Sequence, residues 1–297
     1  MNQKISVGEA LGAGFRLIGR EPLAFAAWCA AYLAVSAVSM FVNWDDTSAY
    51  YDALAAGNGA ATIPAGAFGP AYWLSLLFSL VLFLAVYTAV VRAVLYPEER
   101  RFFYLRLGMR ELWVALSAVL ATLLWFVGYI VCAMVIGLGI GLVGEAAGEG
   151  GALAVGIVMI VLVPVLLWAL VWASLRLSMA TVMSFAENRL RVLASWRFTK
   201  GHALAFFLVS LALGIAALVV FVVLFGVILG GLAAGSTTQP NAGLAILGQI
   251  SQMSAAARLV SSAVISVAYV GFLVMFIAPW AEMYRQLRPG SMASTFD

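Results

Sequence analysis

Six long apolar runs, separated by shorter polar segments, dominate the pattern of this chain. They cover residues 22–42, 70–95, 112–143, 152–175, 203–233 and 259–283. A helix that crosses the hydrocarbon core of a bilayer needs about 20 mostly apolar residues, and the third and fifth runs exceed that length. The runs lack the period-two alternation of barrel strands, and backbone amides in lipid must be paired within the chain. The pattern therefore predicts an all-α integral membrane protein with six transmembrane helices.

Composition supports this prediction. The 297 residues are 65% hydrophobic and 10% charged, whereas a soluble protein carries about 25% charged residues. A soluble fold of this length could not hide so much apolar surface from water, because its buried fraction is limited by its size. We expect residues 1–297 to form a single polytopic membrane domain.

Basic residues are distributed unevenly between the two sets of connecting segments. All but one of the 16 Lys and Arg residues fall in the segments that share a side with both termini. The opposite side has only Arg258, together with the acids Asp45, Asp46, Asp52, Glu145 and Glu149. Lys and Arg near the ends of spans are enriched on the cytoplasmic side. We therefore expect a multi-pass protein whose N- and C-termini both lie in the cytoplasm.

The three basic segments that precede pairs of apolar runs have the pattern of amphipathic helices on the membrane surface. Each combines a helix-start signal with an apolar stripe: Ser6 and Glu9 with Leu11, Phe15 and Ile18; Pro97 with Phe102, Leu105 and Met109; Ser184 and Glu187 with Leu190, Leu193 and Trp196. On the opposite side, Leu244, Leu247, Ile250 and Met253 predict a short interfacial helix. The spans would form three hairpins, each preceded by an amphipathic cytoplasmic-surface helix.

These three segments also resemble one another. Phe15-Arg16-Leu17, Leu105-Arg106-Leu107 and Trp196-Arg197-Phe198 each place an arginine between two large apolar residues. A threefold repeat of surface helix plus hairpin would cover residues 5–95, 97–175 and 184–283. The match is short, and amphipathic helices of similar composition could produce it without common ancestry.

Two sets of residues are candidates for binding and for packing. Bases beside the apolar stripes could bind anionic lipid headgroups or a protein partner, at about 1 kcal/mol per base for lipid, or could serve only to set topology; they are Arg16, Arg20, Arg106, Arg110, Arg197 and Lys200. Two GxxxG pairs predict close helix packing, either within the chain or in a homo-oligomer; they are Gly137 with Gly141 and Gly226 with Gly230.

The side chains that carry chemistry in membrane enzymes are not gathered anywhere in this sequence. The centres of the spans hold no ionisable residue, and His202 is the single histidine. The cysteines, Cys29 and Cys132, lie apart in separate apolar runs. No hydrolase, nucleotide-binding or metalloprotease motif occurs in a suitable context. We expect no enzymatic activity, no cofactor or metal site, and no nucleic-acid partner.

Residues 175–202 carry a family resemblance. Arg176-Leu177-Ser178-Met179-Ala180, then Glu187, then Ala194-Ser195-Trp196-Arg197-Phe198-Thr199-Lys200-Gly201 resemble the signature of a broad bacterial group of six-span proteins. These proteins are described as similar to the membrane domain of glycerophosphodiester phosphodiesterases, or as YciC-like. Ala180 and Thr181 stand where the group often has a proline. The resemblance implies a six-span fold in the bacterial inner membrane, and it implies no activity because the phosphodiesterase domain has no counterpart here.

The leading functional hypothesis is a non-enzymatic scaffold or accessory subunit that binds a membrane-protein partner or organises anionic lipid. It is motivated by the contrast between inert spans and basic surface segments. The alternative is a transporter or channel for a small or amphiphilic substrate, which the hairpins, Pro164 and the glycine-rich third run suggest. A membrane-embedded lipid enzyme is the third and weakest hypothesis.

Overall fold

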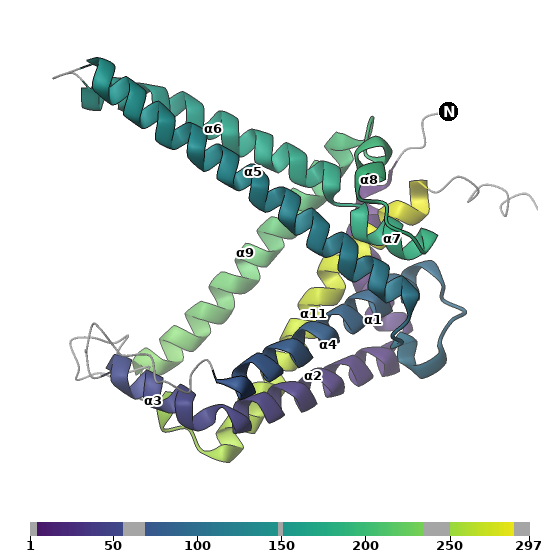
Figure 1. The fold of residues 1–297 in the computed structure, drawn as a ribbon. Helices are drawn as coiled ribbons and strands as arrows, with labels where there is room; N and C mark the ends of the chain where they lie inside the picture. The colour runs from purple at the N-terminus through teal and green to yellow at the C-terminus, as the bar shows by residue number, and fades with distance from the viewer. Residues whose placement is uncertain (1–4, 56–68, 148–150, 235–249, 288–297) are drawn as a thin grey trace, which may run out of the picture. The chain divides into compact units, whose positions relative to one another are not determined.

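The computed structural model describes residues 5–55, 69–147, 151–234 and 250–287, and the regular elements in these ranges are all helical. Six of the helices are long and apolar enough to cross a membrane. They are α2 (Pro22–Val42), α4 (Pro70–Leu95), α5 (Met109–Ala147), α6 (Gly151–Leu177), α9 (Ala203–Ala234) and α11 (Ala255–Leu287) (Figure 1). The predicted all-α class and the six apolar spans are confirmed for the described residues. The six helices indicate a multi-pass membrane protein.

The boundaries of these helices follow from local sequence. Pro22 and Pro70 occupy the first turn of α2 and α4, where the missing N–H of proline costs no helical hydrogen bond. The 39 residues of α5 form one continuous helix, which corresponds to about 58 Å at 1.5 Å per residue. Because the hydrocarbon core is about 30 Å thick, α5 exceeds a straight crossing, as its sequence predicts. Pro164 lies inside α6 without ending it.

The described chain also contains four shorter α-helices: α1 (Val7–Arg20), α3 (Trp44–Ala55), α7 (Ala180–Glu187) and α8 (Val192–Phe198). The sequence did not predict α3, which begins with Asp45 and Asp46 in its first turn. Carboxylates at that end stabilise a helix through its dipole. A short interfacial helix is also predicted at Leu244, Leu247, Ile250 and Met253, and the first two of these residues lie outside the described residues.

The chain divides into two compact units. Unit 1 contains Leu107–Val209 and the described residues of both chain ends, and unit 2 contains Gly8–Arg106 and Ser210–Pro279. The boundaries between the units cut through α9 and α11 and do not coincide with the three predicted repeats. The single domain and its repeats stay predictions.

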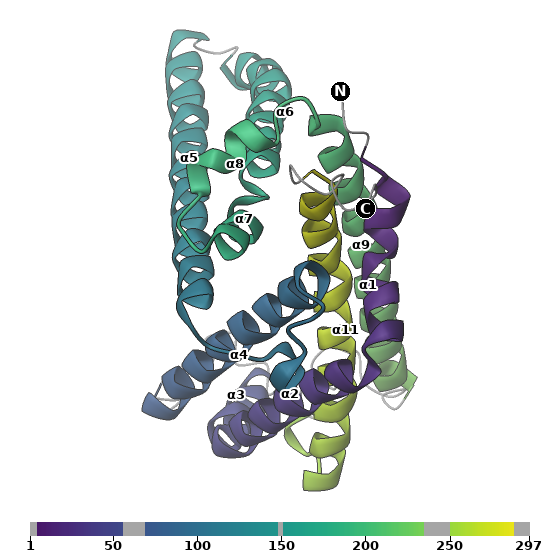
Figure 2. The same ribbon diagram turned by 90° about the vertical axis from the view of Figure 1, so that its right-hand side faces the viewer.

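In unit 1, α5 and α6 run side by side (Figures 1 and 2). Leu170 and Leu162 of α6 pack at Gly128 and Gly139 of α5, 3.4 Å from where a β-carbon would stand on each glycine. Helix α7 packs against the first part of α5 and buries Phe185.

In unit 2, polar and aromatic contacts join the spans. Asn43 Nδ2 at the end of α2 donates to Ser75 Oγ of α4 over 3.0 Å. The hydroxyls of Ser36 in α2 and Ser266 in α11 lie 3.2 Å apart. Helix α1 approaches α11 closely at Gly14, because a β-carbon there would lie 2.9 Å from Met275 Cα. Glycine permits this contact between two helix backbones.

A helix, α1, is formed where the first surface helix is predicted, but its buried face differs from the predicted stripe. The stripe was placed on Leu11, Phe15 and Ile18. The buried residues of α1 are instead Ala10, Ala13, Gly14 and Leu17. Phe15 is exposed, because the small residues of the neighbouring face allow α1 to approach α11.

The second predicted surface helix, from Pro97 to Met109, is wrong. The segment contains a single turn, η1 (Arg101–Tyr104), before α5 begins at Met109. Phe102, Phe103 and Tyr104 have left-handed φ values of 54°, 54° and 65°. This conformation costs roughly 1–2 kcal/mol per residue for L-amino acids, and so it requires stabilisation by distant side chains.

The third predicted surface helix is split into two helices, and its capping box is wrong. Ser184 lies inside α7 instead of capping a helix, and its hydroxyl donates to Ala180 O over 2.7 Å. Asn188 ends α7 in the left-handed conformation, with φ 50° and ψ 41°. Asparagine tolerates this conformation at a helix C-terminus. The chain turns there and starts again as α8.

Candidate functional site

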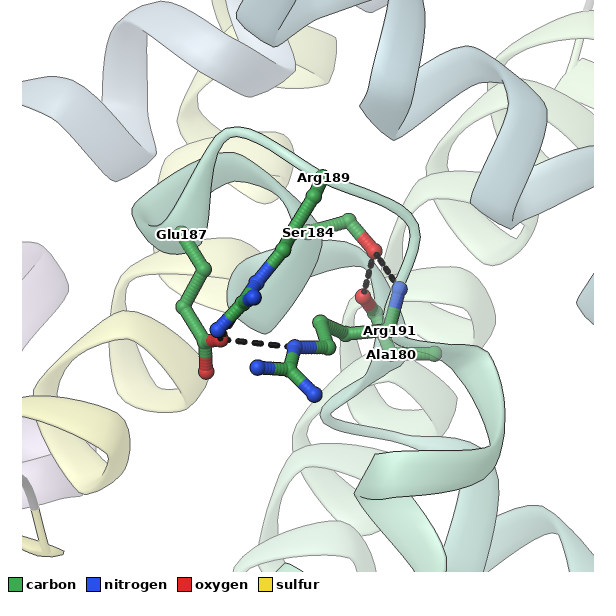
Figure 3. Close-up of polar contacts among 5 residues, drawn as sticks. All are labelled: Ala180, Ser184, Glu187, Arg189 and Arg191. Carbon is green, nitrogen blue, oxygen red and sulfur yellow. Dashed lines mark hydrogen bonds and ion pairs between the residues drawn. The ribbon is translucent and has the colours of Figure 1, made fainter.

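The turn between α7 and α8 is held by one carboxylate and one hydroxyl (Figure 3). Glu187 Oε2 accepts from Arg191 Nε at 2.7 Å and from Arg189 Nη2 at 3.1 Å. Ser184 Oγ accepts from the backbone N–H of Arg191 over 3.1 Å. The only acid in this basic segment therefore pairs with the two bases nearest to it.

Helix α8 is fixed to the end of α6. Ser195, which is fully buried, donates its hydroxyl hydrogen to Arg176 O over 2.7 Å. The rings of Trp172 and Trp196 meet edge to face, 4.8 Å apart. The guanidinium of Arg176 lies 5.3 Å from the centre of the Trp172 ring. These contacts determine which side of α8 points outward.

The outward side of α8 carries Leu193, Trp196, Arg197 and Lys200, which we call the α8 surface. Leu193 is 75% exposed and Trp196 is 40% exposed. The spacing of these four residues places them on one side of a helix, and Lys200 continues that side just beyond the last helical residue. Two apolar side chains and two bases thus share one exposed surface.

The bases of the α8 surface differ from the other bases of the segment in their pairing. Arg197 and Lys200 are exposed, and neither side chain has an acidic partner among the described residues. Glu187, the nearest acid in sequence, is occupied by Arg189 and Arg191. The two charges are therefore available to an anion from outside the chain.

The six predicted binding residues divide between the two units. Unit 1 contains Arg197, Lys200 and Arg110, whose guanidinium lies 5.8 Å from the centre of the Phe185 ring. Unit 2 contains Arg16, Arg20 and Arg106. The structure brings Arg197 and Lys200 together on one surface.

In unit 2, four arginines pair with Glu21 and Glu99, and we call these six residues the Glu21–Glu99 network. Glu21 Oε1 accepts from Arg100 Nε over 3.0 Å and lies 3.6 Å from Arg20 Nε. The hydrogen bond that Arg100 donates to Glu21 raises the pKa of the Arg100 guanidinium above its ordinary value. Arg92 Nε lies 3.4 Å and Arg106 Nη1 lies 3.7 Å from Glu99 Oε2. Arg20 also donates to the carbonyl of Ala93 over 2.6 Å.

Arg92 is the buried centre of this network, with 3% of its side chain exposed. Its Nη1 donates to Tyr104 O over 2.6 Å, and Trp28 Nε1 donates to Phe103 O over 2.9 Å. Both bonds stabilise carbonyls of the left-handed turn η1. The bases of this network therefore serve the fold itself.

Three of the four predicted packing glycines have no close neighbour within their own unit. A β-carbon on Gly137, Gly141 or Gly226 would meet nothing within 4 Å among the described residues. No described residue of the same unit packs at these three positions, and the packing role of these glycines stays a prediction. The surroundings of Gly230 lie outside the described part of the chain, and a contact between copies stays a prediction.

The residues that sequence analysis missed are the buried partners: Trp28, Arg92, Ser195 and Thr199. Arg92 carries the one available signal, which is a charge within an apolar run beside Pro97-Glu98-Glu99. Ser195 and Thr199 are spaced four residues apart, and both prove to be buried. Both stand in the segment that carries the family resemblance, but that resemblance does not indicate which of its hydroxyls are buried.

No protein-family model, curated protein or solved structure matches this chain. The resemblance of residues 175–202 to six-span bacterial proteins stays a prediction. The described residues contain no group of three His, Cys, Asp or Glu side chains placed to hold a metal ion.

Proposed function

We propose that this protein is a non-enzymatic scaffold or accessory subunit of the bacterial inner membrane, which gathers anionic lipid through the α8 surface. Both termini and the α8 surface would face the cytoplasm. The six spans would form three hairpins that hold the surface elements at the bilayer. The strong bias of Lys and Arg to one set of connecting segments supports this orientation.

The observation that carries the proposal is that the two bases of the α8 surface are not paired with an acid. Arg197 and Lys200 are exposed without an acidic partner in the described chain, beside the exposed side chains of Leu193 and Trp196. Apolar side chains next to bases suit the boundary between acyl chains and headgroups. Helix α8 is fixed to α6 by Ser195 and by the contact of Trp172 with Trp196, so the bases are held in position.

The lipids that copurify with the protein test the proposal. Wild type, the double variant Arg197→Gln with Lys200→Gln, and Arg189→Gln would be purified in a mild detergent, and bound lipids quantified by mass spectrometry. Arg189 is the matched control, because it is an exposed base of the same segment that already pairs with Glu187. We expect wild type and Arg189→Gln to retain phosphatidylglycerol and the double variant to lose most of it.

Equal retention of phosphatidylglycerol by the double variant would contradict lipid recognition at α8. A protein that copurifies with wild type and Arg189→Gln, but not with the double variant, would identify a membrane-protein partner as the ligand of the same surface. The two forms of the scaffold hypothesis are thus distinguished in one preparation.

A second candidate function, transport of a small or amphiphilic substrate, is favoured by a polar seam between α2 and α11. The Tyr32 and Tyr269 rings lie 4.8 Å apart, and the hydroxyl of Ser262 donates to Met40 Sδ over 3.2 Å. Together with the Ser36–Ser266 contact, these pairs line one side of each helix inside the spans. The pairs are in direct contact, so transport would require the helices to separate.

A cross-link across the seam would test transport. Ser36→Cys with Ser266→Cys, in a chain whose native cysteines are replaced by alanine, would be reconstituted in vesicles. A transporter should lose flux of a permeant amphiphile on oxidation and recover it on reduction. No flux in either state would contradict the transport hypothesis and leave lipid retention at α8 unaffected.

A further inference from the structure

The turn η1 in unit 2 is locked from several directions. Trp28 of α2 donates to Phe103 O, and Arg92 of α4 donates to Tyr104 O, over 2.9 and 2.6 Å. The hydroxyl of Tyr104 donates to Pro97 O over 3.1 Å and closes the base of the turn. Side chains from two helices and from the turn itself therefore hold three backbone carbonyls.

The consequence of this lock is an outward position for two aromatic rings. Phe102 is 69% exposed and Phe103 is 47% exposed, whereas Tyr104 is 1% exposed. Bulky residues rarely adopt positive φ, and such backbone persists only where its surroundings fix it, often at functional sites. The fold thus maintains an unfavourable backbone conformation that presents Phe102 and Phe103 outward.

The charges beside these rings indicate what the turn contacts. The guanidinium of Arg101 lies 5.5 Å from the centre of the Phe102 ring and has no acidic partner among the described residues. Residues 96–108 connect α4 directly to α5, and so the turn must lie close to the membrane surface if both helices span it. Aromatic rings and arginines are the side chains that occupy the interface between headgroups and acyl chains.

We propose that η1 is a rigid interfacial anchor, which inserts Phe102 and Phe103 at the boundary between headgroups and acyl chains and places Arg101 at lipid phosphates. Its occupant is the leaflet in which α4 and α5 end. The anchor is separate from the α8 surface, and it does not depend on the proposed scaffold function.

Spin-label accessibility tests this anchor directly. A nitroxide would be attached at Phe103→Cys in a chain with Cys29 and Cys132 replaced by alanine, and reconstituted in vesicles of phosphatidylcholine and phosphatidylglycerol. Oxygen concentrates in lipid, whereas a nickel chelate stays in water. We expect the label at position 103 to collide several-fold more with oxygen than with the chelate.

Glu98→Cys provides the matched control, because Glu98 is exposed in the same connecting segment five residues away. Its label should favour the chelate. Equal, chelate-dominated accessibility at positions 98 and 103 would overturn the anchor. A label at position 103 that is shielded from both reagents would also overturn it, since that result indicates burial against protein.

Trp28→Phe tests whether the lock sets the position of the turn. This variant keeps a ring in α2 and removes the N–H that bonds to Phe103 O. The oxygen preference of the label at position 103 should fall toward the value at position 98, while the elution volume of the protein is unchanged. An unchanged oxygen preference would overturn the rigid character of the anchor.

Discussion

The α8 surface and the Glu21–Glu99 network contain the same kind of residue in opposite situations. Around Glu21 and Glu99, two carboxylates pair with four arginines: Arg20, Arg92, Arg100 and Arg106. In the segment of α8, Glu187 pairs with Arg189 and Arg191, and Arg197 and Lys200 are left without an acid in the described residues. Sequence position alone makes all of these bases look alike. Their partners separate bases that stabilise the fold from bases that can bind a ligand.

The largest change in the free energy of unfolding is expected when Arg92 is replaced. Arg92→Met removes a buried charge that bonds to Tyr104 O and faces Glu99. Breaking a buried pair costs about 3–5 kcal/mol, and the partial exposure of Glu99 places the expected loss near the lower value, about 3 kcal/mol. The free energy of unfolding in bicelles, measured by steric trapping, checks the value. Arg197→Gln is the control and should change the free energy of unfolding by less than about 0.5 kcal/mol. Equal losses in the two variants would contradict the distinction between bases that stabilise the fold and bases of the α8 surface.

Smaller changes in the free energy of unfolding are expected when a closely packed glycine and an open glycine are each replaced by alanine. Gly14→Ala in α1 would place a β-carbon 2.9 Å from Met275 Cα of α11. Helix backbones would have to move apart, at a cost of about 2 kcal/mol. Gly137→Ala on α5 meets no neighbour and should stabilise its helix by up to about 1 kcal/mol. The same unfolding measurement applies to both variants.

Gly137→Ala also separates monomer from oligomer. If a second copy packs against α5 at Gly137, the substitution would weaken self-association in detergent while leaving the stability of the monomer intact. Sedimentation of the two forms would show this directly. A destabilised monomer would contradict the open surroundings of Gly137.

The smallest effect is expected when the two bases that pair with Glu187 lose their acidic partner. Glu187→Gln removes the acid that pairs with Arg189 and Arg191, and so adds one net positive charge to the segment. The affinity of the protein for phosphatidylglycerol should rise about 5-fold, which corresponds to roughly 1 kcal/mol for one additional charge. Stability should change by less than about 1 kcal/mol, because the ion pairs are partly exposed to solvent. Weaker lipid binding in this variant would show that the pairing itself builds the site.

The six spans could be predicted from the sequence because their signal is local. Each span is a continuous apolar run, and the observed helices α2 and α4 begin and end where the runs do. The sides of α8 also follow from spacing, because Leu193 and Trp196 are on the exposed side with Arg197. Whether that side faces the membrane stays a prediction.

The turn η1 and the pairing of the bases could not be predicted, because distant residues determine them. Trp28 bonds to a carbonyl 75 positions later in the chain, and Arg20 bonds to one 73 positions later. The apolar residues of the segment from Pro97 to Met109, and the proline at its start, favour a helix when read alone. Only the positions of Trp28 and Arg92 in three dimensions stabilise the left-handed turn instead.

The most direct test of the central claim is the affinity of the α8 surface for anionic lipid. Native mass spectrometry of the purified protein, titrated with phosphatidylglycerol or phosphatidylcholine, gives the ratio of the two dissociation constants. Two bases at about 1 kcal/mol each predict that wild type prefers phosphatidylglycerol by about 30-fold and that Arg197→Gln with Lys200→Gln abolishes this preference. A double variant with the full preference of wild type would contradict the account.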